Sequence, residues 1–188
     1  MSFLSIPYYW YFVPGVSVIA LFMALYFFKS MMKKEEGTSR MKEIAQYVRE
    51  GAFAYLSQQY KTVSIVFFVL FIIFIILAFL GIQNPFVPIA FLTGGFFSGL
   101  CGFLGMKTAT YASSRTANGA RTSLNQGLTI AFRAGAVMGL VVVGFGLLDI
   151  SAWFFLLNYI YDHNLFDFGI TLAQKAALVT TGWSDSLI

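Results

Sequence analysis

Charged residues are scarce in this sequence, which excludes a soluble globular fold. They make up 11% of the 188 residues, whereas hydrophobic residues make up 59%. An average soluble domain is about a quarter charged and about half apolar. Uncharged runs as long as those found here leave no side of a helix or sheet to face water. The lipid bilayer is therefore the expected surrounding of the chain.

Cysteine is represented only by Cys101. A single cysteine excludes an internal disulfide framework and any metal site built from several cysteines. Because Gly99 and Gly102 flank it within an apolar stretch, we interpret Cys101 as a small packing residue.

Recognisable catalytic motifs are also missing. Magnesium-dependent enzymes that act on polyanions hold their metal ions with several neighbouring carboxylates, and the sequence contains no such cluster. It has no phosphate-binding loop ending in Gly-Lys-Ser or Gly-Lys-Thr, no HExxH pair and no Ser-His-Asp constellation with plausible partners. His163 has no His, Cys or acid at ligand spacing. We therefore predict no catalytic, cofactor-binding or metal-binding residue in this chain.

Four stretches are long and apolar enough to cross a membrane, since roughly twenty helical residues span a hydrocarbon core of about 30 Å. We predict a single transmembrane region over residues 1–188, with spans at about 8–28, 62–82, 86–107 and 130–157. The first span opens with aromatic residues and closes on Lys29, the reverse polarity of a secretory signal peptide. The prediction is an all-α integral membrane protein with two antiparallel helix pairs.

The connecting segments are expected at 29–61 and 108–129. Within the first, apolar residues from Met41 to Leu56 recur at helical spacing, which predicts an amphipathic helix. Such a helix could lie on the membrane surface or run straight into the second span as a rod. We favour the rod, because no Gly or Pro interrupts the residues that follow.

Small residues line one side of the third span and of the fourth. The third carries Gly95, Gly99, Gly102 and Gly105, and the fourth carries Ala131, Gly135 and Gly139. Small residues three or four apart allow two helix backbones to approach closely in a membrane. We therefore expect the third helix to be buried against a neighbour, and the third and fourth helices to pack face to face through these stripes.

The basic residues fix the expected orientation. Every Lys and Arg except Lys175 lies in or beside the segments 29–61 and 108–129. The positive-inside rule places both segments in the cytoplasm and both termini outside. Membrane orientation also accounts for the basic pI, so a nucleic-acid partner is not expected.

Two ionisable residues in the fourth span are candidates for function: Asp149, the one acid within it, and Arg133 near its cytoplasmic end. Asp149 could relay a proton or cation, because burying an acid at membrane depth is costly. We favour the alternative that the helix meets the outer interface there, since Trp153 and Asn158 follow. Arg133 could bind a phosphate, but an arginine that snorkels to the cytoplasmic interface is the commoner arrangement.

Three motifs resemble those of the membrane-integral, ion-pumping inorganic pyrophosphatases. They are GFLGMKTATYASSRTANGAR at 102–121, AFRAGAVMGL at 131–140 and, upstream, REGAFAYLSQQYKTV at 49–63. They stand in the order that the family has. The resemblance is strong over about 41–148, and over the first span it rests on position and topology only.

The resemblance implies a dimeric pump of about sixteen helices that hydrolyses cytoplasmic pyrophosphate with Mg²⁺, in some members with K⁺, and exports protons or sodium ions. In that family an inner ring of later, Asp-rich helices builds the catalytic site and the ion gate. The first four helices belong to an outer ring. We therefore expect this chain to be the inactive N-terminal portion of such a pump, located in a bacterial plasma membrane.

The C-terminal end departs from the family pattern. Residues 169–188 lie where the family has its fifth helix, but the stretch is short, contains Lys175 and ends in TTGWSDSLI. We expect a partial sequence, a premature stop or a frame change. The alternative is a self-contained four-helix membrane scaffold or accessory subunit without activity. The basic segment from Lys107 to Arg133 could also attract a polyanionic substrate, although topology alone would require its charges.

Overall fold

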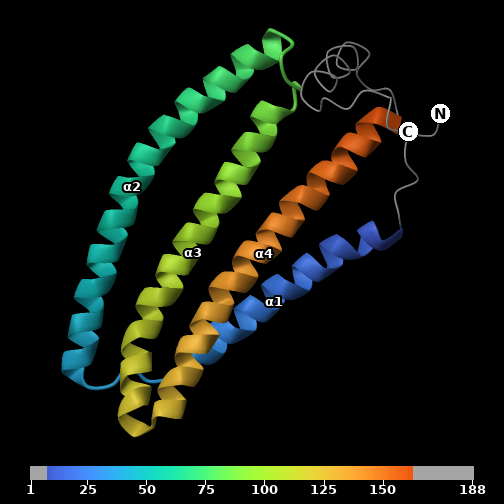
Figure 1. Ribbon diagram of the computed structural model, residues 1–188. Helices are drawn as coiled ribbons and strands as arrows, with labels where there is room; N and C mark the ends of the chain where they lie inside the picture. The colour runs from blue at the N-terminus through green and yellow to red at the C-terminus, as the bar shows by residue number, and fades with distance from the viewer. Residues whose placement is uncertain (1–7, 163–188) are drawn as a thin grey trace.

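A computed structural model describes residues 8–162 of the protein as a row of long helices (Figure 1). The short 3-10 helix η1 (Tyr8–Tyr11) leads into α1 (Phe12–Met32), which is followed by α2 (Ser39–Phe79), α3 (Val87–Thr122) and α4 (Leu124–Asp162). Within this range there is no β-strand. All four α-helices are long and apolar enough to cross a membrane. The predicted all-α membrane fold is confirmed.

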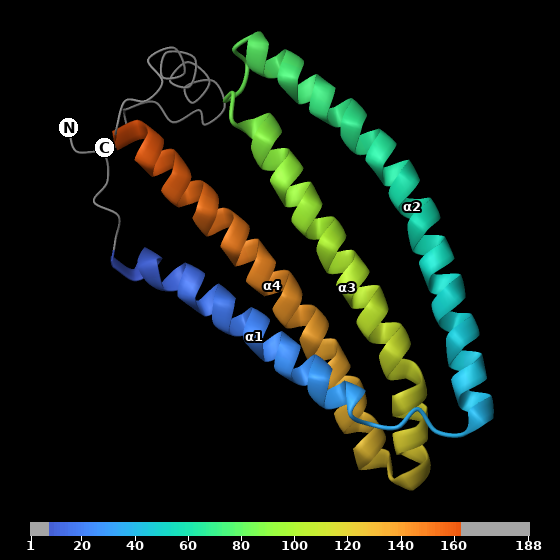
Figure 2. The same cartoon turned by 180° about the vertical axis from the view of Figure 1, so that it is seen from behind.

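The helices lie in the order α2, α3, α4, α1, and neighbours in the row run antiparallel (Figures 1 and 2). The contacting pairs are α2 with α3, α3 with α4, and α4 with α1, while α1 also touches α3. Helix α1, the first α-helix of the described region, therefore packs on α4, the last one. The α1–α2 connection and the α3–α4 turn lie together at one end of the row.

Helix α2 is a single rod of 41 residues. At 1.5 Å per residue it is about 61 Å long, roughly twice the thickness of a hydrocarbon core. Thr38 caps its first turn, because the Thr38 hydroxyl accepts a hydrogen bond from the backbone N–H of Met41. This continuity confirms the rod interpretation of the amphipathic segment.

Glycine is required at the two turns that flank α2. Gly37 has φ +97° and Gly81 has φ +71°, values in the left-handed region that a residue with a Cβ rarely adopts. Gly81 follows the last residues of α2 in the position where glycine commonly ends a helix. The two residues let the chain leave and enter long helices through short connections.

The interval 108–129, which we assigned to a connecting segment, is helical on both sides of Ser123. Ser123 alone is extended, with φ −160° and ψ 147°. Its hydroxyl accepts a hydrogen bond of 3.2 Å from the backbone N–H of Gln126 and so caps α4. One capping residue is thus enough to reverse the chain. Where this helical hairpin leaves the membrane stays a prediction.

Helix α3 is packed closely against its neighbours, as predicted. The prediction that the stripe Ala131, Gly135, Gly139 of α4 packs on α3 was wrong. A Cβ on Gly95 would overlap the ring of Phe67 on α2, and one on Gly105 would overlap Met138 on α4, so α3 approaches both neighbours closely. In contrast, a Cβ on Gly135 or Gly139 would meet nothing within 4 Å.

Helix α4 packs through a different face, because its branched apolar residues fill the space against α1 and α3. One core cluster holds Ala24, Cys101, Val137 and Val141, and a second holds Met31, Ala112 and Ile130. The stripe Ala131, Gly135, Gly139 lies on the exposed side of α4. Cys101 is buried in the first cluster, which confirms its interpretation as a packing residue.

Candidate functional site at the basic end of the helices

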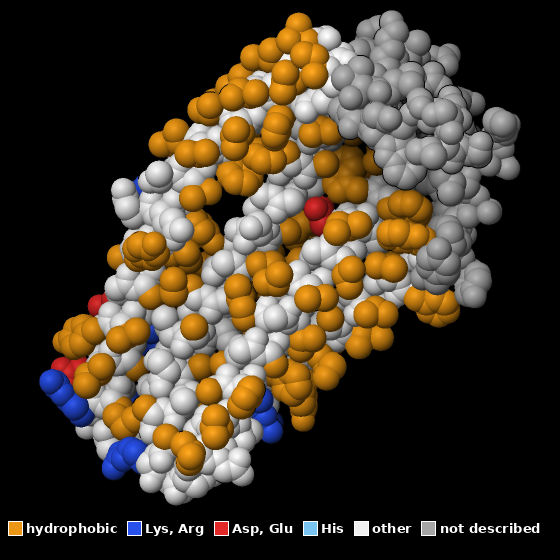
Figure 3. Space-filling view, in the orientation of Figure 1, with side chains coloured by type: hydrophobic (Ala, Val, Ile, Leu, Met, Phe, Trp, Pro, Cys, Tyr) orange, Lys and Arg blue, Asp and Glu red, His pale blue; other side chains and the backbone are white. Residues whose placement is uncertain are grey.

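Charged side chains are concentrated where the α1–α2 connection meets the α3–α4 turn. On the face shown in Figure 3, Lys and Arg side chains gather mainly at this end, and hydrophobic side chains are spread over the remainder. The charge distribution matches a helix bundle whose middle lies in hydrocarbon.

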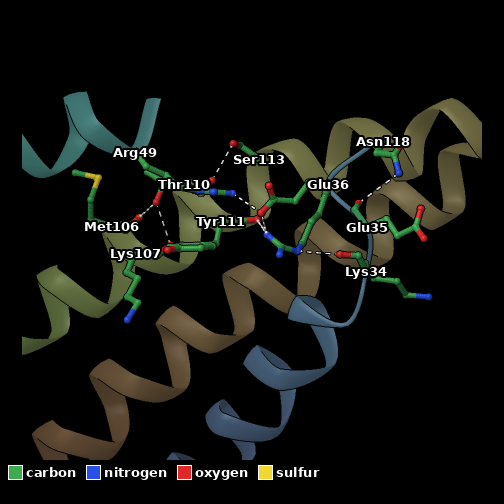
Figure 4. Close-up of polar contacts among 11 residues, drawn as sticks. Lys34, Glu35, Glu36, Arg49, Met106, Lys107, Thr110, Tyr111, Ser113 and Asn118 are labelled. Carbon is green, nitrogen blue, oxygen red and sulfur yellow. Dashed lines mark hydrogen bonds and ion pairs between the residues drawn. The ribbon is translucent and has the colours of Figure 1, made fainter. Parts of the chain in front are cut away.

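The carboxylate of Glu36 is the centre of a buried ion-pair cluster. Glu36 lies in the α1–α2 connection, accepts a hydrogen bond from Arg49 of α2 and forms an ion pair at 2.8 Å with Arg115 of α3 (Figure 4). The Arg115 side chain is only 8% exposed, and those of Arg49 and Glu36 are 17% and 16% exposed. Two guanidinium groups therefore share one carboxylate away from bulk water.

Two backbone carbonyls and one aromatic ring provide further contacts to the two arginines, although the buried Nε of Arg49 has no hydrogen-bond partner. Arg115 donates to the carbonyl oxygens of Lys34 at 2.9 Å and of Tyr111 at 2.6 Å. The guanidinium carbon of Arg49 lies 4.2 Å from the centre of the Tyr111 ring, a cation–π contact. Asn118 adds a bond of 3.3 Å to the carbonyl of Glu35. Together these contacts hold the α1–α2 connection against α3.

Sequence reasoning missed this cluster. The segment around Arg115 contains no acid, and the acid that pairs with it comes from a connection far away in the sequence. The only local signal was the Glu35-Glu36-Gly37 sequence beside the first span. The pairing reduces the charge available for attracting a polyanion, because two of the basic side chains at this end are already neutralised in part.

Arg133 joins α4 to α1. Its guanidinium donates a hydrogen bond of 2.8 Å to the hydroxyl of Ser30. The structure thus gives this arginine a partner within the protein at the basic end. Its interpretation as a snorkelling residue or a phosphate ligand stays untested.

Asp149 lies where α4 meets the first turns of α3. Its carboxylate is half-buried, and a Cβ on Gly94 would lie 3.7 Å from one of its oxygens. One helical turn further along α4, the indole N–H of Trp153 donates a hydrogen bond of 2.8 Å to the hydroxyl of Thr93. Among residues 8–162, no three His, Cys, Asp or Glu side chains gather closely enough to hold a metal ion. His163 lies outside the described residues.

Four antiparallel apolar helices with a charged end define a polytopic helical membrane protein. The family profile described as "Inorganic H+ pyrophosphatase" matches residues 18–182. Within that class, the chain therefore belongs to the inorganic H+ pyrophosphatase family. The resemblance inferred from the three motifs is confirmed.

Curated relatives of the chain are pumps named for pyrophosphate. The "Putative K(+)-stimulated pyrophosphate-energized sodium pump" of Bacteroides thetaiotaomicron is 60% identical over 170 residues, covering 90% of this chain and 23% of the relative. The "K(+)-insensitive pyrophosphate-energized proton pump 2" of Moorella thermoacetica is 42% identical over 76% of this chain and 20% of the relative. The "K(+)-stimulated pyrophosphate-energized sodium pump" of Thermotoga maritima is 40% identical over 72% of this chain and 18% of its own length. The chain thus spans about a quarter or less of each.

Proposed function

We propose that the chain is the N-terminal, non-catalytic portion of an ion pump that couples pyrophosphate hydrolysis to the export of protons or sodium ions. The observation that carries the proposal is the family match over residues 18–182, together with relatives that are more than four times as long as the matched region. The names of these relatives give pyrophosphate as the energy source and sodium ions or protons as the pumped ion.

The catalytic chemistry is assigned to the remainder of the pump. The Glu36 carboxylate at the basic end is already shared by Arg49 and Arg115 and so is not free to hold a metal ion. We therefore place the pyrophosphate, its Mg²⁺ and the ion gate on helices outside this chain. The K⁺ stimulation named for the Bacteroides relative is extended to the parent pump as part of the proposal.

The proposed role of this chain is to pack against those helices. The Gly135 and Gly139 positions on α4 are open, since a Cβ there would meet nothing within 4 Å. In a membrane, such a stripe allows another helix to approach closely. We further propose that the basic end faces the cytoplasm of a bacterial cell, by the positive-inside rule, and that the parent pump is a homodimer.

A chimeric pump tests the proposal directly. The region of the Bacteroides relative that aligns with this chain is replaced by residues 18–182, and the pump is reconstituted with Mg²⁺ and pyrophosphate. We expect the chimera to hydrolyse pyrophosphate, because the replaced region would supply packing only.

The isolated chain is the matched control for catalysis. Purified in detergent and given Mg²⁺ and pyrophosphate, it is expected to release no phosphate. Turnover by the isolated chain would overturn the assignment of the site to other helices. A chimera that folds and inserts but stays inactive would favour the four-helix scaffold instead.

A further inference from the structure

A second feature, separate from the Glu36 cluster, is a cavity of about 300 Å³ between α1, α3 and α4. All of its lining residues except Lys107 and Thr108 are apolar. The Thr108 hydroxyl is already bonded to the carbonyl of Leu104 at 2.7 Å. The ammonium group of Lys107 is therefore the polar group that the cavity offers to a ligand.

The cavity has the dimensions of a hydrocarbon chain. Its walls are residues 21–28 of α1 and 137–145 of α4, so it is about 10 to 12 Å long at 1.5 Å per residue. Its volume holds roughly ten groups the size of a water molecule, at about 30 Å³ each. A stretch of acyl chain of similar length therefore fits against these walls.

Lys107 places an unpaired positive charge at the edge of this apolar space. Within residues 8–162 its ammonium group has no ion-pair partner, unlike Arg49 and Arg115. Figure 4 shows its side chain pointing away from the Glu36 cluster. Lys107 is half-buried as a residue, and a cation held beside apolar walls is stabilised when an anion meets it.

Hydrocarbon walls and a lone cation together select an anionic amphiphile, and in a membrane that amphiphile is a phospholipid. Basic residues at the ends of transmembrane helices are known binding sites for anionic headgroups. We propose that the cavity binds one anionic phospholipid, with its phosphate on Lys107 and part of an acyl chain between Leu21, Val137 and Phe145.

Native mass spectrometry of the full chain tests the proposal. The protein, in detergent, is given equal amounts of phosphatidylglycerol and phosphatidylcholine with identical acyl chains. We expect one retained lipid, with phosphatidylglycerol favoured about fivefold, the factor that one basic residue near an anionic surface contributes. The Lys107→Gln variant should retain both lipids equally, whereas Lys107→Arg should keep the preference.

Two further variants separate the cavity from general charge and from folding. Lys61→Gln removes an exposed cation of α2 that does not line the cavity, so the preference should be unchanged. Leu25→Trp enlarges a lining residue that is 55% exposed and can be accommodated without unfolding. It should reduce retention of both lipids.

Three results would overturn the lipid site. The first is an unchanged preference in Lys107→Gln. The second is displacement of the lipid by millimolar inorganic phosphate, which would indicate a site for a free anion. The third is loss of the lipid in the chimeric pump while the isolated chain retains it, which would assign the cavity to the pump's other helices. Hydrolysis by the chimera does not depend on any of these results, so the two proposals fail separately.

Discussion

Removing the charge of Glu36 should destabilise the protein far more than removing an exposed acid. Glu36→Gln keeps the side chain's size but leaves two mostly buried guanidinium groups without their anion. Breaking a buried ion pair costs about 3–5 kcal/mol, and the slight exposure of Glu36 favours about 3 kcal/mol. The matched control is Glu43→Gln, because the Arg40–Glu43 pair is 74% and 48% exposed and should contribute about 0.5 kcal/mol or less.

Cys101 provides the assay, since it is the only cysteine and is buried between α1, α3 and α4. A thiol reagent labels it only when the helices separate, so the labelling rate follows the population of the open state when reclosing is fast. A loss of about 3 kcal/mol predicts labelling roughly 140-fold faster in Glu36→Gln, and about 0.5 kcal/mol predicts a twofold rise in the control. Equal rates in the two variants would refute the idea that the buried cluster stabilises the fold.

Three other substitutions have expected outcomes of different kinds. In a thermal unfolding assay, Gly127→Ala should lower the free energy of unfolding by about 1–3 kcal/mol, because the new Cβ would lie 3.1 Å from rigid backbone atoms of α3. The control Gly135→Ala should show no loss in the same assay, because its new Cβ would meet open space. Gly139→Leu should leave the unfolding of the isolated chain unchanged and abolish hydrolysis by the chimeric pump, and an active chimera would show that no helix packs on that stripe. Trp153→Phe should cost about 1 kcal/mol through its lost hydrogen bond to Thr93, and adding Thr93→Val in a double-mutant cycle should cost little more.

Local patterns in the sequence predicted the helices well. The uncharged length of each span and the helical spacing from Met41 onwards are properties of neighbouring residues, and they correctly indicated four long helices and the rod of α2. The small side of α3 was also recognised, because Gly95 and Gly105 do face close neighbours.

Packing between distant segments was not predictable in the same way. A stripe such as Gly135 and Gly139 shows that a face is small, but not that it meets the helix next in sequence, and α4 in fact turns its Val137 and Val141 face to the core. The pairing of Glu36 with Arg115 depends on how the α1–α2 connection lies on α3, which no local spacing encodes.

Site-directed labelling of cysteines tests the membrane topology most directly. In a Cys101→Ser background, single cysteines are placed at Lys34, Arg121 and Ile82, all exposed positions in or beside the connections between helices. A membrane-impermeant maleimide is predicted to label the Ile82 variant in intact cells, and the Lys34 and Arg121 variants only after the membrane is opened. Labelling of Lys34 and Arg121 from opposite sides would contradict the four-crossing topology.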